Sequence, residues 1–183
     1  MAVVVPYVAN TAWADNAGGG TPITAAKLNV VEDGITNAHL MAAVRVTHNT
    51  SQSIASGSLV ALAFNTERFD QAGGASSTQH DTVTNNTRLT CRYAGVYQIS
   101  GCVLFGASAA GAGRALEVRL NGTTVIVLQQ DAPSAFASMS VSTLYSLAVN
   151  DYVELLAFQD SGSAMTIASS GNYSPEFAMV RVA

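Results

Sequence analysis

From residue 44 to the end of the chain, apolar and polar residues alternate along short segments. In Arg114–Leu120, the side chains of Leu116, Val118 and Leu120 share one face, and Met139–Leu147 alternates in the same way with serines on its polar face. A period of two is typical of half-buried β-strands. The alternation predicts strands at residues 44–48, 59–64, 87–93, 96–105, 114–120, 123–128, 139–147, 152–158, 164–168 and 177–182.

Short turn signals separate these segments. Asn121-Gly122 lies between two predicted strands and is a strong two-residue hairpin signal. Asn150-Asp151 predicts a similar turn before Tyr152. Many short strands with turns between them are typical of an all-β fold. We therefore expect an antiparallel jelly-roll sandwich of about ten strands, forming a head domain at residues 44–183.

Some predicted strands are apolar on both faces, and one of them is the continuous apolar run at residues 125–128. Residues 152–158 carry a charge only at Glu154. A strand covered on both faces lies between two layers, whereas one face of a single sandwich normally meets water. The second apolar face, formed by Tyr152, Leu156 and Phe158, is therefore predicted to be a subunit interface.

The first 43 residues follow other patterns. Residues 1–20 read as an extended arm that closes in three glycines, and residues 21–43 read as a short helical neck with Thr24 as its N-cap. So short a helix is marginal alone, but three copies could pack at the base of a trimer. The alternative is one amphipathic helix packed on its own domain. The apolar seam has heptad spacing and consists of Leu28, Val31, Ile35 and Ala38.

Composition supports self-association. Hydrophobic residues make up 49% of the 183 residues and charged residues only 11%, against roughly 25% charged in average domains. The net charge is −4 with a single lysine, and the arginines are scattered, so nucleic-acid binding is not expected. No apolar run approaches the roughly 20 residues needed to cross a bilayer, so we expect no membrane insertion. No secretory signal is recognised at Met1–Tyr7.

Catalytic and metal-binding patterns are weak. The three histidines have no metal-ligand spacing, and His80-Asp81 beside two serines lacks the held nucleophile of a hydrolase. Cys91 and Cys102 are interpreted as two small buried hydrophobes rather than a disulfide. Carboxylates such as Glu154 and Asp160 could bind a hard cation, although solvated acidic residues are the favoured reading. The prediction is a protein that is not an enzyme, with no cofactor and no metal.

The head segment resembles the globular head of the first complement component, within the tumour-necrosis-factor-like jelly-roll superfamily. This resemblance implies a ten-stranded jelly roll that forms a tight trimer, recognises partners through outer loops and performs no catalysis. Leu89 and Ile99 replace the family's usual aromatics, and Asn150 replaces its usual glycine. The matching segments are Phe64-Asn65, Phe69, Leu89–Ile99, Leu147–Leu155 and Ser174–Phe177.

Residues 13–35 are similar to a segment found near the start of many tailed-bacteriophage structural proteins, through Thr21-Pro22-Ile23-Thr24-Ala25 and the Leu-Asn-x-x-Glu-x-Gly-Ile run that follows. The two resemblances together imply a homotrimeric virion protein, made in the bacterial cytoplasm, that attaches to a host surface protein or glycan. Tyr7 and Trp13 are the expected anchors to other virion proteins, because aromatics dominate binding hot spots. The alternatives are a capsid decoration or head-fibre protein and a bacterial surface adhesin of complement-like fold.

Overall fold

The computed structural model describes residue 24 and residues 27–32, 42–72, 78–108, 110–132 and 137–183. The chain divides into two compact units, Met1–Leu40 and Met41–Ala183. In the first unit, residues 27–32 are helical. The hydroxyl of Thr24 accepts a hydrogen bond from the Lys27 amide at 3.3 Å, which confirms the predicted N-cap. None of the helical residues described forms a segment long and apolar enough to cross a bilayer.

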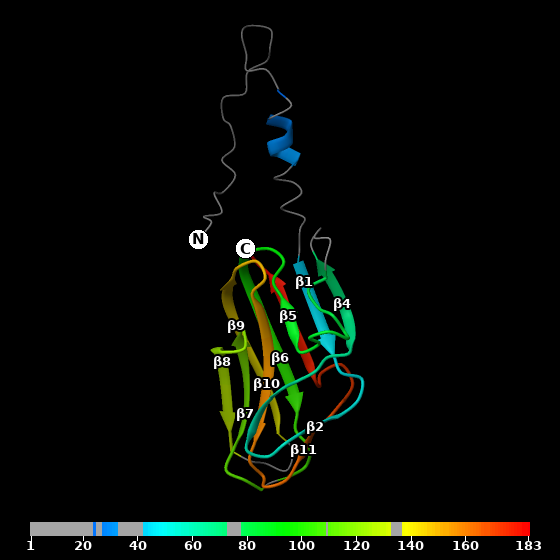
Figure 1. Ribbon diagram of the computed structural model, residues 1–183, viewed down its shortest axis with the longest axis vertical. Helices are drawn as coiled ribbons and strands as arrows, with labels where there is room; N and C mark the ends of the chain where they lie inside the picture. The colour runs from blue at the N-terminus through cyan, green and yellow to red at the C-terminus, as the bar shows by residue number, and fades with distance from the viewer. Residues whose placement is uncertain (1–23, 25–26, 33–41, 73–77, 109, 133–136) are drawn as a thin grey trace. The chain divides into compact units, whose positions relative to one another are not determined.

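The second unit is made of β-strands (Figure 1). They follow one another with turns and loops between them, and the first strand begins two residues before the predicted start of the head domain. Within the described residues the strands are β1 (Ala42–Thr47), β2 (Gln52–Ile54), β3 (Ser58–Ala61), β4 (Thr66–Ala72), β5 (Arg88–Thr90), β6 (Gly95–Leu104), β7 (Arg114–Leu120), β8 (Thr124–Asp131), β9 (Ser138–Leu147), β10 (Tyr152–Gln159), β11 (Met165–Ile167) and β12 (Glu176–Arg181).

Two large antiparallel sheets face each other. Each has five strands when β5 is counted. The first, for which the name five-stranded sheet is reserved below, has the order β4-β1-β12-β6-β9. The second, called the outer sheet, has the order β3-β10-β7-β8, with β5 pairing to the start of β10. A small third sheet joins β11 to β2. The predicted all-β antiparallel jelly roll is thus confirmed.

The core lies between the two sheets. Alternation sends one face of each strand inward, so that Val44, Ile99 and Phe177 of the five-stranded sheet meet Leu116 and Leu155 of the outer sheet, all of them almost fully buried. The rings of Phe64 and Phe177 stack with centroids 5.8 Å apart. Apolar burial of this kind stabilises a fold by about 25 cal/mol per Å² of surface removed from water.

Both predicted turns form, with different consequences. Asn121 and Gly122 have φ values of 51° and 74°, and they close the predicted hairpin between β7 and β8. Leu120 pairs with Thr124, so the loop spans residues 121–123 and is one residue longer than predicted. Asn150 also has a positive φ, of 70°, and the Asp151 carboxylate accepts the Ala148 amide hydrogen at 2.8 Å. This second turn is no hairpin, because β9 and β10 belong to different sheets.

Two strands were not predicted. β4 contains three charged residues within seven positions, and β2 has three residues of which only Ile54 is apolar. Neither shows an apolar alternation, so the sequence pattern contains no strand signal there. β4 forms because it pairs along the whole of β1, which is a tertiary effect.

Gly101 of β6 marks a close approach of the two sheets. It points into the core between Ile99 and Val103, and a Cβ at this position would lie 2.7 Å from a methyl carbon of Leu155. Any larger residue would push the sheets apart, since protein interiors are close-packed.

We expect Gly101→Val to lower the free energy of unfolding by about 2 kcal/mol, in the range of overpacked cores. Urea denaturation followed by circular dichroism measures the loss. Gly113→Ala is the matched control, because its Cβ would meet only the Asp131 carbonyl oxygen at 3.7 Å. Equal stability of the two variants would contradict the close sheet contact.

Candidate functional site

The five-stranded sheet has one face turned away from the core, called the free face below. Cross-strand register places its residues in rows that run from β1 across β12 and β6 to β9. Only Arg45 and Glu176 among them are charged, and most of the others are small. The rows are Ala43, Val180, Gln98 and Leu144; Arg45, Ala178, Ser100 and Ser142; and Thr47, Glu176, Cys102 and Ser140.

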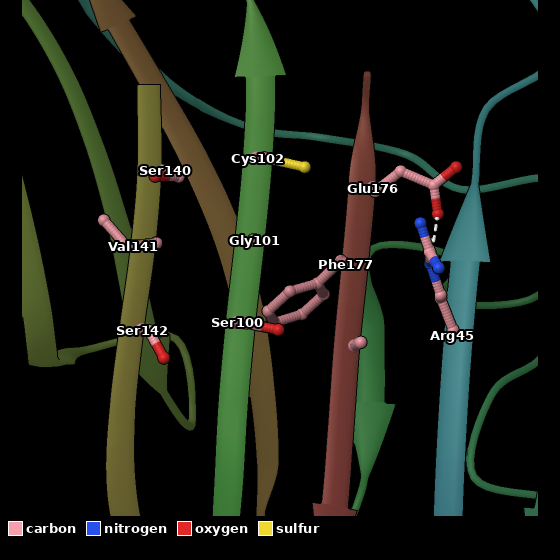
Figure 2. Close-up of a pocket in the computed structure, with 10 residues that line it drawn as sticks. Arg45, Ser100, Gly101, Cys102, Ser140, Val141, Ser142, Glu176 and Phe177 are labelled. Atoms are coloured by element: carbon pink, nitrogen blue, oxygen red, sulfur yellow. Dashed lines mark hydrogen bonds and ion pairs between the residues drawn. The ribbon is translucent and has the colours of Figure 1, made fainter. Parts of the chain in front are cut away.

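A shallow hollow of about 500 Å³ lies over the second and third rows. Figure 2 shows Ser140 and Ser142 on one strand, Ser100 and Cys102 on the next, and Arg45 beyond them. The hollow exists because the serine and alanine side chains of these rows are small and leave the backbone uncovered. Its lining suits a packed apolar or hydroxyl-bearing surface and offers little to a charged small molecule.

Glu176 closes one end of the hollow with a buried ion cluster. Its carboxylate is 4% exposed and accepts hydrogen bonds from Arg45 Nε at 2.9 Å and from Arg68 Nη2 at 2.7 Å. Arg68 also binds the Gly171 carbonyl, and Arg45 binds that of Asn172. The cluster therefore joins β1, β4 and β12 to the loop before β12.

Cys102 lies beside this cluster and is held as a thiol. Its sulfur donates to the Tyr173 carbonyl oxygen at 2.7 Å. Burial raises the pKa of the thiol, and the nearby negative charge of Glu176 raises it further. A protonated thiol is a poor nucleophile. Both cysteines are free thiols, as predicted. The prediction that both are buried holds for Cys91, whereas Cys102 is partly exposed.

The predicted interface residues of β10 lie on the outer sheet, on its solvent face. Leu156 is 7% exposed within the single chain, and Tyr152 and Phe158 are half-buried. The Arg88 guanidinium covers the Tyr152 ring at 4.1 Å from its centre. The apolar character of this face is thus largely satisfied inside one chain, and its role as a subunit interface stays a prediction.

The other predicted site residues belong to the first unit. Leu28 and Val31 are exposed on the helical residues 27–32, at 51% and 37%. The predicted seam continues at Ile35 and Ala38, which lie outside the described residues, as do the anchors Tyr7 and Trp13 and the arm, residues 1–20.

The groups considered for catalysis or metal binding have structural partners. The buried His80 ring faces Glu67, at 3.1 Å, rather than Asp81. Asp160 accepts the amide hydrogens of Ala112 and Gly113, and these bonds hold the pKa of its carboxyl below its ordinary value. In the described ranges, no three histidine, cysteine or acidic side chains cluster as metal ligands would.

Solved structures of other proteins share this fold. No family model and no curated protein matches this chain. Among solved structures, murine APRIL at pH 8.0 matches with a TM-score of 0.57 and 12% identity, over 78% of this chain and 99% of that one. Eiger TNF from S. frugiperda matches with a TM-score of 0.56 and 10% identity, over 78% and 93%. The second unit therefore has a TNF-like jelly-roll fold.

We expect Glu176→Gln to lower the free energy of unfolding by about 3 kcal/mol, the low end for breaking a buried pair because both arginines reach water. Two guanidiniums would then face each other without a carboxylate. Chemical denaturation measures the effect. The control Asp131→Asn, at an exposed carboxylate, should change stability by less than about 0.5 kcal/mol. Similar losses in both variants would refute a special role for the cluster.

Proposed function

We propose that this chain is a structural protein of a bacteriophage virion, which forms a homotrimer and presents its jelly-roll head for attachment to the host surface. The observation that carries the proposal is the free face, a broad sheet surface nearly without charge. The central parts of protein interfaces are likewise depleted in charged residues. The occupant proposed here is a second copy of the chain.

A closed ring of identical subunits needs two different patches that fit each other. The free face with its hollow is one of them. The second is the side of the sandwich where β8 and β9 lie next to each other (Figure 1), joined by a hydrogen bond from the Ser140 amide to the Gln129 side chain at 3.0 Å. On the β8 part of this side, Val125 and Leu128 are 44% and 46% exposed, and their register with Arg119 and Glu117 places them on the solvent face of the outer sheet.

The virion setting rests on the N-terminal segment. Residues 13–35 are similar to the segment that precedes fibre and spike modules in tailed-phage proteins. In this proposal the arm, residues 1–20, docks into a groove or sheet edge of a neighbouring capsid or tail subunit. Tyr7 and Trp13 are the anchoring side chains, and the head faces outward.

Light scattering on the purified protein tests the trimer. The expected mass is three times the 18.9 kDa of one chain. Ser142→Arg places a charge in the central row of the free face, so it should shift the mass towards one chain. Thr166→Arg, at an exposed position of β11, is the matched control and should leave the trimer intact.

Dissociation by Phe158→Arg with no effect of Ser142→Arg would place the interface on β10, as the sequence analysis predicted. A wild-type protein with the mass of one chain at micromolar concentration would contradict the proposed assembly.

Phage particles test the role. Particles without this protein should adsorb poorly to host cells, and deletion of residues 1–20 should abolish incorporation of the protein. Trp13→Ala should reduce incorporation, whereas Tyr173→Ala, at an exposed aromatic of the head, should not. Fragile heads with normal adsorption would instead identify a capsid decoration protein, and unchanged incorporation after the deletion would refute the anchoring arm.

A further inference from the structure

A polar pocket of about 320 Å³ opens on the solvent face of the outer sheet, where β5 meets the start of β10. One wall comes from Arg88, Thr90 and Arg92, which follow one another at alternate positions and so share a face. The ring of Tyr152 and the turn at Asn150 form the opposite wall. This site is separate from the free face, because it belongs to the other sheet.

Within the described residues, each arginine of the pocket forms its hydrogen bond through Nε. Arg88 Nε donates to the Glu154 carboxylate at 3.3 Å, and its guanidinium lies over Tyr152. Arg92 Nε donates to the Thr78 carbonyl oxygen at 2.6 Å. Among the described residues, neither guanidinium uses its terminal nitrogens in a hydrogen bond. Each is thus oriented, with a pair of donors still available for an oxyanion.

A buried network fixes the loop that forms the third wall. The His80 side chain is fully buried, and its backbone amide donates to Asp70 Oδ2 at 2.9 Å. Its ring contacts Glu67 of β4, and the carbonyl of Gln79 accepts the Thr90 amide hydrogen at 2.7 Å. The loop is therefore tied to both β4 and β5, and the pocket needs little reorganisation to bind a ligand.

The rim adds neutral donors and acceptors. Asn85 and Asn150 both have positive φ, and their side-chain amides form no hydrogen bond within the described part of the chain. Asp81 is exposed, and its carboxylate accepts the amide hydrogens of Val83 and Thr84. Counting Arg88, Arg92 and Asp81, the charged groups that line the pocket have a net charge of +1.

We propose that this pocket binds a sugar that carries an oxyanion, a carboxylate or a phosphate, on the host surface. The oxyanion pairs with Arg88 and Arg92, and the sugar hydroxyls bind Asp81 and the two asparagine amides. Arg88 already pairs with Glu154, so a neutral sugar would leave the Arg92 guanidinium without a counter-charge within the described residues. A bare inorganic anion would leave the amides unused and would face the Asp81 carboxylate. The host setting rests on the proposed attachment function, whereas the binding chemistry does not.

Isothermal titration calorimetry on the full-length protein tests this inference with two matched pairs of probes. Trigalacturonate is compared with maltotriose, and glucose 6-phosphate with glucose. At least one acidic probe should bind with a Kd of about 1 mM or tighter, at least 10-fold more tightly than its neutral partner. Because the interaction is ionic and partly exposed, a rise in sodium chloride from about 0.05 to 0.5 M should weaken it.

Arg92→Gln should reduce the affinity at least 10-fold. This variant should fold normally, since the partner of Arg92 among the described residues is a backbone carbonyl. Arg88→Gln should have a similar effect on binding. Arg119→Gln is the control, because Arg119 pairs with Glu117 on the same sheet and does not line the pocket. Binding by only one acidic probe identifies the oxyanion as carboxylate or phosphate.

Two results would overturn the inference: acidic probes that bind no more tightly than their neutral partners, or an Arg92→Gln variant that binds as well as Arg119→Gln. Failure of the proposed function looks different. Normal adsorption by particles lacking the protein would remove the attachment role, yet it would leave the calorimetric difference between acidic and neutral sugars in place.

Discussion

Two antiparallel sheets meet across one apolar core, and this contact decides what every strand presents to the outside. Since side chains alternate along a strand, each residue that reaches the core leaves its neighbours on an outer face. The contact is close enough that Gly101 has no room for a side chain against Leu155. In the described part of the second unit, the two sheets therefore present two outer faces, and these faces differ in their side chains.

The outer sheet covers its solvent face with its own side chains. Glu154 is bonded by Thr87 and Arg88, and Glu117 pairs with Arg119, so that charged groups shield Leu156 from water. Among the described residues, the free face of the five-stranded sheet has no comparable set of charged side chains, and serines and alanines occupy most of its rows. Its one buried ion cluster, around Glu176, lies at the end of the hollow. The free face is therefore the surface that a second subunit would complete.

The sequence predicted the fold class and the ten strands whose apolar residues alternate. Apolar alternation indicates a strand that buries one of its faces. β2 and β4 bury few apolar side chains, so the sequence shows no such pattern there. The same limit explains the site. The sequence located the apolar side chains of β10, but it could not indicate that Arg88 stacks on Tyr152, because this contact joins residues 64 positions apart through cross-strand register. The free face was also missed, since its serines look like those of any solvated strand.

Assembly and recognition are compatible in this arrangement. The Arg88–Arg92 pocket lies on the solvent face of the outer sheet, and the free face lies on the opposite side of the sandwich. A trimer closed through the free face would leave three pockets open. A monovalent sugar site with a Kd of about 1 mM is too weak to hold a particle on a cell. Linked sites that engage one surface together can gain roughly 10²- to 10⁴-fold in avidity without any new contact. Trimerisation would then be the step that makes a weak pocket sufficient for attachment.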